Sequence, residues 1–377
     1  MSAKDNNNNT LPPFASDVPV ADIATVDFDL LSQGDPEQAQ ILLHSCQNYG
    51  FFYLSNHHVD SRFMFDLADR VFSLPLDEKL RYDMGTTGHY YGYKRSGAMF
   101  VDDKGTKDHS EFYNVSKDEV LGIPQPSTTK TVSGHHPQVV LDRFEELQTF
   151  MKSCHRVIYT ITTSLGKSLG LPEGLLESLH ELDRPSVDQA RVTCAPPVRP
   201  AETITLGEHT DFGSVTVLFN QLGGLQVLAP NKRDWEYVRP RPECAVINLG
   251  DSLIKLLGGR LYSAVHRVVV PPGPQGECMR HSVVYFSRPN SSVKLRDLFQ
   301  YPTDEDVKRL EQEASGGPLL NADEWVKQRA HNWNTAQYKG KESYKLSRGT
   351  EHNREWESVK LEQQQQQQQR PKAVEAV

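Results

Sequence analysis

The fold is decided by one stretch of the chain, Gly207-Glu208-His209-Thr210-Asp211-Phe212-Gly213-Ser214-Val215-Thr216-Val217-Leu218. Within it an imidazole and a carboxylate lie two residues apart, at His209 and Asp211, and a run of strand-forming residues follows. Alternate residues of a strand point to the same face, so we expect both side chains on one rigid edge. The pair by itself is weak evidence, because the chain has 14 histidines and a surface turn near Gly207 and Gly213 gives the same pattern.

Two further anchors follow in a fixed order. His266 lies in the apolar run 262–270, and Arg280-His281-Ser282 leads into another such run. Taken singly, His266 can be explained as a histidine of the hydrophobic core, and Arg280 as the basic partner in a structural salt bridge. Taken together, two imidazoles and a carboxylate can hold one face of a ferrous ion and leave positions open. A guanidinium with a hydroxyl two residues on can hold the far carboxylate of a small organic acid.

Zinc is the inorganic alternative, because a site of two histidines and an aspartate can also activate water on Zn²⁺. A zinc hydrolase gives no reason for a carboxylate clamp at Arg280 and Ser282, whereas an iron centre that binds a keto acid does. The order of the anchors therefore favours an oxygen-activating iron enzyme.

The pattern around the anchors predicts a mainly β core. Between residues 188 and 290, short β-type runs alternate with turns, which is typical of an antiparallel sandwich or barrel. The expected strands cover 190–193, 214–219, 225–228, 237–239, 245–249, 264–270 and 282–287. Apolar spacing predicts helices over 37–49, 61–73, 138–169 and 303–332, a buried strand over 50–54 and a loop or hairpin over 85–98.

Composition narrows the class of protein. The chain has 377 residues with 41 basic and 49 acidic side chains, so its formal charge is −8. This balance argues against nucleic acid or an anionic membrane as the main partner. The five cysteines are odd in number and widely spaced, which predicts reduced thiols. The N-terminus lacks the apolar core of a signal peptide, so we expect a cytoplasmic location.

Over roughly residues 18–330 the chain resembles the Fe(II)/2-oxoglutarate-dependent dioxygenases, and specifically their isopenicillin N synthase-like branch. The resemblance is carried by Val18-Pro19-Val20-Ala21-Asp22, by residues 49–57 with Gly50-Phe51-Phe52 and Asn56-His57, by Asp108-His109-Ser110-Glu111-Phe112, by the stretch 207–218, by Asn248-Leu249-Gly250-Asp251 and by Arg280-His281-Ser282.

The resemblance implies a mainly β fold with flanking helices: a distorted double-stranded β-helix (jelly roll) core and an α+β N-terminal region. It implies that His209, Asp211 and His266 ligate Fe(II), and that Arg280 and Ser282 hold the distal carboxylate of 2-oxoglutarate. O₂ is then the oxidant, and ascorbate is expected to support turnover. Such a dioxygenase hydroxylates, desaturates or cyclises a small organic metabolite, typically a specialised one, with release of succinate and CO₂.

Substrate contacts are expected from aromatic residues near the anchors. Tyr91 and Tyr93 belong to the loop before Asp108-His109-Ser110-Glu111-Phe112, a neighbourhood that borders the substrate in the family. Phe212 and Phe286 lie beside the anchors and can wall the same pocket. A packed aromatic turn and an ordinary core explain the same residues without a substrate.

The chain divides into four regions. Residues 1–16 and the glutamine-rich tail 336–377 are expected to be disordered, residues 17–135 to form the N-terminal α/β region, and residues 136–335 to form a helix, the jelly roll and C-terminal helices.

Two other functions stay open. One is a 2-oxoglutarate-independent iron oxidase of the isopenicillin N synthase type, favoured by Ala195 where the family commonly has a cosubstrate-binding tyrosine. The other is a non-catalytic ligand-binding module on the same fold.

Overall fold

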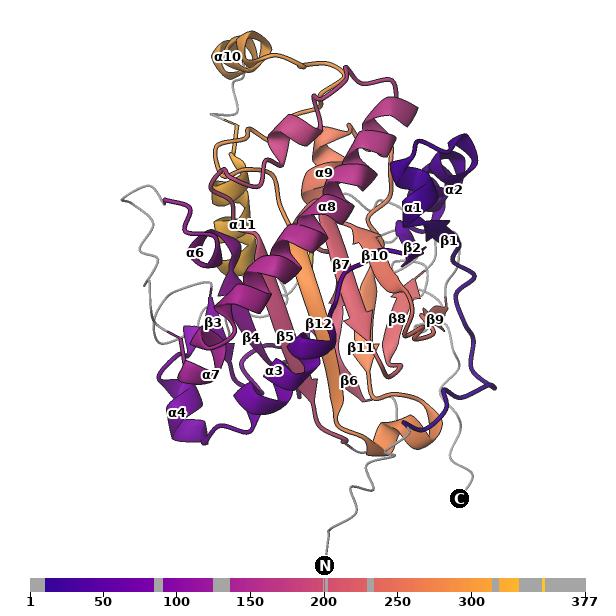
Figure 1. Ribbon diagram of the computed structural model, residues 1–377, viewed down its shortest axis with the longest axis vertical. Coiled ribbons are helices and arrows are strands. Elements are labelled where there is room, and N and C mark those ends of the chain that lie inside the picture. The colour runs from indigo at the N-terminus through magenta and orange to yellow at the C-terminus, as the bar shows by residue number, and fades with distance from the viewer. Residues whose placement is uncertain are drawn as a thin grey trace, which may run out of the picture.

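The computed structural model describes residues 11–84, 91–124, 136–198, 200, 203–228, 234–313, 319–331 and 348–349. Two β-sheets pack face to face, and helices cover the outer face of the larger one (Figure 1). The strands are β1 Thr25–Asp27, β2 Phe51–Ser55, β3 Gly92–Lys94, β4 Glu111–Ser116, β5 Gln189–Ala195, β6 Ile204–His209, β7 Val215–Asn220, β8 Leu225–Leu228, β9 Trp235–Tyr237, β10 Ala245–Leu249, β11 His266–Val269 and β12 Arg280–Ser287.

The helices lie mostly before and after the strands of the core. They are α1 Phe28–Ser32, α2 Pro36–Asn48, α3 Arg62–Phe72, α4 Leu76–Leu80, α6 Lys117–Val120, α7 Gln138–Leu141, α8 Phe144–Ser168, α9 Asp251–Leu256, α10 Asp304–Glu313 and α11 Ala322–His331, with short 3₁₀ turns at Glu177–Leu179 and Gly273–Glu277. No helix in the described part of the chain is long and apolar enough to cross a membrane.

The larger sheet has the strand order β1-β2-β10-β7-β12-β5-β4-β3, and the smaller one has the order β6-β11-β8-β9. Neighbouring strands pair antiparallel except β1 and β2, which run parallel. Strands distant in sequence therefore meet side by side, as β7 and β12 do. This is the predicted jelly-roll core with flanking helices.

Side-chain alternation along β12 explains the two apolar layers of the molecule. Val283 and Tyr285 face outward and pack in the large cluster that includes the buried face of α8, which runs diagonally across the sheet in Figure 1. Val284 and Phe286 face inward, toward the smaller sheet. Successive strand residues point to opposite faces, so one strand serves both layers.

Three expectations need correction. The helix predicted over 138–169 is broken at Asp142 and Arg143, between α7 and α8. No strand was expected over residues 204–208, where Gly207 and Glu208 are residue types that strands disfavour. Strand β6 ends at His209, so Asp211 lies beyond the strand and shares no strand face with His209. The two side chains converge because the chain turns, not because they alternate along a strand.

The two ends of the chain also differ in part from expectation. Residues 1–10 lie outside the described part, but Phe14 packs edge-on against Tyr237 and Pro12 accepts a hydrogen bond from Gln275. In the tail, Arg348 and Gly349 are described and buried, whereas the glutamine run lies outside the described residues.

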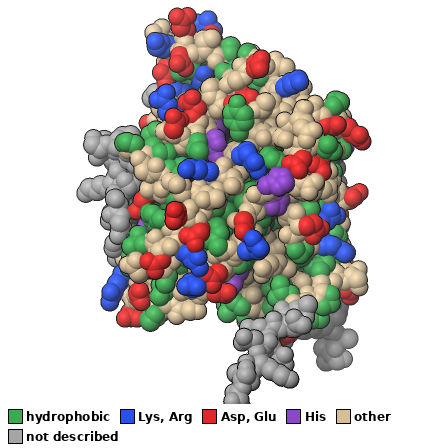
Figure 2. Space-filling model, viewed as in Figure 1, with side chains coloured by type: hydrophobic (Ala, Val, Ile, Leu, Met, Phe, Trp, Pro, Cys, Tyr) green, Lys and Arg blue, Asp and Glu red, His purple; other side chains and the backbone are tan. Residues whose placement is uncertain are grey.

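Of the expectations drawn from composition, the one about the cysteines is confirmed and those about partners and location are not tested. All five cysteines are free thiols, as predicted. Acidic and basic side chains are interspersed over the face of the molecule seen in Figure 2. The predicted absence of a nucleic-acid or membrane partner and the cytoplasmic location stay predictions.

Candidate metal centre and cosubstrate pocket

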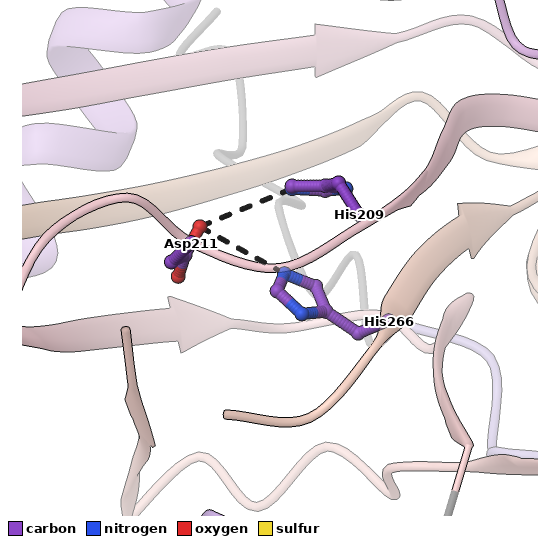
Figure 3. A group of neighbouring side chains, drawn as sticks. All are labelled: His209, Asp211 and His266. Carbon is purple, nitrogen blue, oxygen red and sulfur yellow. Dashed lines mark ion pairs between the residues drawn. The ribbon is translucent and has the colours of Figure 1, made fainter. Parts of the chain in front are cut away.

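Three buried side chains meet at one point between the two sheets. His209 comes from the end of β6, Asp211 from the turn after it, and His266 from the start of β11. Asp211 Oδ1 lies 3.9 Å from His209 Nε2 and 4.0 Å from His266 Nε2 (Figure 3). One donor atom from each residue lies within 4.8 Å of the other two, which is close enough for all three to bind a single cation.

Backbone carbonyls fix the orientation of both imidazoles. His209 Nδ1 lies 2.8 Å from the carbonyl of Gly207, and His266 Nδ1 lies 3.1 Å from that of Ala264. A carbonyl only accepts, so each Nδ1 carries the proton and each Nε2 presents a lone pair. Burial, reinforced by the neighbouring His266, lowers the pKa of His209, which keeps its ring neutral, as a metal ligand requires.

The two oxygens of Asp211 have separate environments. Oδ2 accepts hydrogen bonds from the Thr216 hydroxyl at 2.6 Å and from the Asn248 amide at 2.7 Å. Oδ1 faces the two imidazoles. Burial alone would raise the pKa of Asp211, but the imidazoles and these hydrogen bonds bring it below its ordinary value. The set of two neutral imidazoles and one ionised carboxylate fits Fe(II) with open positions.

Arg280 lies at another part of the same pocket and is 4 % exposed. Its Nε donates to the carbonyl of Gly223 at 2.7 Å, and its Nη1 lies 3.4 Å from the Ser282 hydroxyl. Among the described residues no carboxylate pairs with it, so the salt-bridge explanation for Arg280 finds no support there. Burial lowers the pKa of Arg280 to about 10, and the group remains a cation at neutral pH.

The pocket joins these two groups in one cavity of about 110 Å³ between the sheets. By this measure a water needs about 10–15 Å³, so the cavity can hold a small organic molecule. Phe212 and Phe286 line it, as do residues that sequence reasoning did not select. These are Phe51, Ser110, Phe112, Arg191, Thr193, Ala195, Thr205, Leu206, Thr216, Leu218, Leu225, Asn248, Val268, Val284 and Arg288.

Tyr91 and Tyr93 do not line this cavity, so the structure does not support the predicted substrate contacts there. Tyr93 is buried on β3, at the far edge of the large sheet, and its hydroxyl donates to Glu111 at 2.5 Å. The segment that leads into β4 therefore reaches the cavity through Ser110, and β4 itself reaches it through Phe112.

Thr193 and Arg191 could have been found from strand alternation. Residues 191, 193 and 195 of β5 share one face, and all three line the cavity. Thr193 lies opposite Ser282 in the strand register, with 2.5 Å between the two hydroxyl oxygens. Ala195 lies opposite Arg280. The signal was present in the sequence, but only the strand pairing says which β5 residue meets which anchor.

Comparisons with known proteins agree with this site. The family model described as non-haem dioxygenase in morphine synthesis N-terminal matches residues 18–137, and that of the 2OG-Fe(II) oxygenase superfamily matches residues 187–289. A 2-oxoglutarate-dependent dioxygenase of Gibberella zeae is 31% identical over 80% of this chain and 88% of its own length. One from Dothideomycetidae sp. is 31% identical over 82% of this chain and 89% of its own.

Solved structures show the same fold. A full-length Neurospora crassa protein in complex with alpha-KG superposes with a TM-score of 0.66 at 24% identity, over 85% of this chain and 99% of that one. JOX2 in complex with 2OG, Fe and JA gives 0.61 at 24% identity, over 85% of this chain and 87% of that one. The chain belongs to the 2OG-Fe(II) oxygenase superfamily and is a non-haem dioxygenase that uses Fe(II), 2-oxoglutarate and O₂ to oxidise a small molecule.

Proposed function

We propose that His209, Asp211 and His266 hold the Fe(II), and that Arg280 and Ser282 hold the distal carboxylate of 2-oxoglutarate. One observation carries this proposal: a buried cation and a buried triad of metal-ligand type share a single cavity. A buried guanidinium is costly unless an anion joins it, and a dicarboxylate whose other end reaches the metal supplies that anion.

The bound iron and 2-oxoglutarate supply the oxidising chemistry, which consumes O₂, releases succinate and CO₂ and oxidises a C–H bond of the substrate. The residues of the chain orient and enclose the reactants. Arg280 and Ser282 fix one end of the keto acid, and the Thr193 hydroxyl holds that of Ser282 in place. The surrounding apolar side chains, such as Val284 and Leu225, exclude water from the cavity.

The substrate occupies the other end of the cavity, near Phe286. Arg280 and Phe286 are six residues apart on β12, or about 20 Å at about 3.3 Å per strand residue. Phe286 pairs with Thr216, whose hydroxyl holds Asp211, so this end borders the metal site. The Arg191 guanidinium lies 3.8 Å from the centre of the Phe112 ring and 4.9 Å from that of Phe286.

This wall indicates the kind of substrate. Arg191 Nε donates to the side-chain oxygen of Asn114 at 2.7 Å, which holds its guanidinium near the two aromatic rings. Aromatic faces favour a flat apolar ring, and a fixed guanidinium favours a carbonyl or carboxylate oxygen. We infer a small, flat metabolite that carries such an oxygen, in keeping with a specialised metabolite. Its oxidation is a hydroxylation, a desaturation or a ring closure.

Succinate release tests the residue roles. The wild-type enzyme, given Fe(II), 2-oxoglutarate and ascorbate under air, is expected to form succinate, and His209→Ala, Asp211→Ala and His266→Ala are each expected to abolish it. Succinate formed at the wild-type rate by His266→Ala would reject the metal assignment. Mass spectrometry of candidate metabolites in the same assay then identifies the substrate by a product that gains one oxygen atom or loses two hydrogens.

A further inference from the structure

The turn that carries Asp211 lacks the support of a strand ladder. Strand β6 ends at His209, and residues 210–214 have no strand partner. Buried backbone groups need hydrogen bonds, so this turn must find them elsewhere. The start of α9 supplies some of them: Asp251 N–H donates to the carbonyl of Asp211 at 2.8 Å, and Ser252 N–H donates to that of Gly213 at 3.0 Å.

The carbonyl of Ser287 at the end of β12 accepts from Ser214 N–H at 2.8 Å, Trp325 of α11 donates to the carbonyl of Phe212 at 3.3 Å, and the C-terminal tail holds Thr210. Thr210 N–H donates to the carbonyl of Arg348 at 2.9 Å. The Thr210 hydroxyl lies within hydrogen-bond distance of Gly349 O and, at 2.9 Å, of Asp251 Oδ2. The Arg348 guanidinium donates to the carbonyl of Glu208 and, at 3.1 Å, to that of Phe100. Two residues of the tail thus hold the backbone on both sides of His209.

The fit between the tail and this turn is close. Gly349 has a φ of +71°, and an added Cβ would lie 2.4 Å from Thr210 Oγ1 and 2.8 Å from Asp251 Oδ2. At Gly207 an added Cβ would lie 2.5 Å from Arg348 Nη1. Position 349 therefore requires glycine for the tail to pack against Thr210, and the absence of a side chain at Gly207 leaves room for the Arg348 guanidinium. Arg348 is 6 % exposed in this arrangement, so the contact is a buried one.

We propose that Arg348 and Gly349 form a C-terminal strap that positions His209-Thr210-Asp211 for metal binding, with Thr210 as the positioning residue between the two ligands. The proposal rests on the metal roles assigned above to His209 and Asp211. Thr210 touches no metal in this account. It acts by holding the backbone from outside, while its two neighbours point inward. Groups that orient metal ligands typically change metal affinity about 10- to 100-fold when lost.

Co(II) binding to the full-length chain tests the strap. Visible absorption follows the binding and reports the coordination geometry of the bound ion. Gly349→Ala is expected to lower Co(II) affinity at least tenfold, because the new methyl group displaces the strap from Thr210. Gly34→Ala is the matched control: Gly34 also has a positive φ, +81°, but no atom lies within 4 Å of its added Cβ. It is expected to bind Co(II) as the wild type does.

A second pair of variants keeps the test independent of folding defects in Gly349→Ala. Thr210→Val removes the hydroxyl at nearly constant volume and is expected to weaken Co(II) binding, whereas Thr210→Ser retains it and is expected to restore the affinity. A purely structural contact would lower the thermal midpoint of the metal-free protein in Gly349→Ala and Thr210→Val and leave their Co(II) affinity unchanged. That result overturns the strap proposal.

His209→Ala separates this proposal from the metal assignment on which it rests. If His209→Ala binds Co(II) as tightly as the wild type, the metal assignment itself is wrong. If His209→Ala loses binding while Gly349→Ala and Thr210→Val keep it, the assignment stands and only the strap is rejected.

Discussion

At the scale of single residues, Asp211 divides its two oxygens between two tasks. Oδ2 is held by Thr216 and Asn248, and Oδ1 is left to face the imidazoles. The carboxylate plane is therefore set before any metal arrives, and the metal need not order it. Orientation of this kind, by groups that do not touch the metal, is a general feature of protein metal sites.

We expect Thr216→Val and Asn248→Leu each to weaken Fe(II) binding about tenfold. In each variant Oδ2 loses a donor, and the carboxylate can rotate away from the geometry that the imidazoles share. Thr216→Ser keeps the donor and should bind Fe(II) like the wild type. Anaerobic titration calorimetry measures all three, and equal affinities for Thr216→Val and Thr216→Ser would contradict the role of this hydrogen bond.

Arg280 is the residue for which shape matters as much as charge. Its Nε is used by the carbonyl of Gly223, so only the outer edge of the guanidinium can face a ligand. Arg280→Lys keeps the charge but loses the planar fork. We expect the KM for 2-oxoglutarate to rise at least tenfold with little change in kcat, measured by succinate release over a range of 2-oxoglutarate concentrations.

Arg267→Lys provides the comparison for Arg280→Lys. Arg267 lies on β11, only one residue from His266, but its guanidinium bonds to Gln226 and lies over the Trp235 ring. It does not line the cavity. An equal rise in KM in both variants would show that the effect comes from general damage to the sheets.

At the scale of elements, three segments meet without side chains between them beside the metal site. An added Cβ at Gly250, just before α9, would lie 2.4 Å from the carbonyl of Gly213, and one at Gly213 would lie 2.3 Å from that of Ser287. The turn after β6, the start of α9 and the end of β12 thus touch through their backbones. This contact explains why glycine stands at position 213, just after the metal motif, and at position 250, just before α9.

Gly250→Ala is expected to lower the free energy of unfolding by about 1–3 kcal/mol, the usual cost of overpacking against a backbone that cannot yield. Gly166→Ala within α8 is the counterpart, because its added Cβ meets Leu176 at an ordinary 3.7 Å and alanine favours a helix. Urea unfolding of the two variants measures the difference. A Gly250→Ala protein as stable as Gly166→Ala would refute the close contact.

The elements also show what sequence could predict and what it could not. Helices α2 and α3 and strand β2 lie where apolar spacing predicted them, because local patterns decide them. Strand β6 was missed because pairing with β11, not its own sequence, defines it. For the same reason the strand argument for His209 and Asp211 was wrong in its geometry, although the two residues meet.

At the scale of the whole molecule, burial acts in one direction on several histidines. It lowers the pKa of His57, His180, His209 and His281 from their ordinary value of 6.5. Below about pH 6.5 the unfolded chain therefore binds more protons than the folded one, and acid favours unfolding. The pKa of Asp211 is lowered as well, which adds to the loss at pH below about 4.

The thermal midpoint of the metal-free protein is accordingly expected to fall steadily from pH 7.5 to pH 5, in calorimetric scans at constant ionic strength. His180→Gln should show a shallower fall, because this fully buried histidine no longer gains a proton on unfolding. A midpoint that stays constant or rises over this range would contradict the direction of these shifts.

Across the whole chain, the sequence indicated which residues share the cavity better than it indicated which residues support them. His209, Asp211, His266, Arg280 and Ser282 were identified because few chemistries need that order of residue types, and the structure brings them to one cavity. The partners that orient them come from strand pairing and from the tail, and no local pattern points to these. Residues 348–349 lie in a tail that was predicted to be disordered from its composition, yet they are buried against Thr210.

The central claim is that three side chains and one guanidinium of this chain bind one metal and one keto acid together. A crystal structure of the enzyme grown anaerobically with Mn(II) and 2-oxoglutarate tests it most directly. The account predicts an anomalous peak bonded to His209 Nε2, Asp211 Oδ1 and His266 Nε2, with the far carboxylate of 2-oxoglutarate on Arg280. A metal bound elsewhere, or a keto acid that leaves Arg280 without an anion, would contradict it.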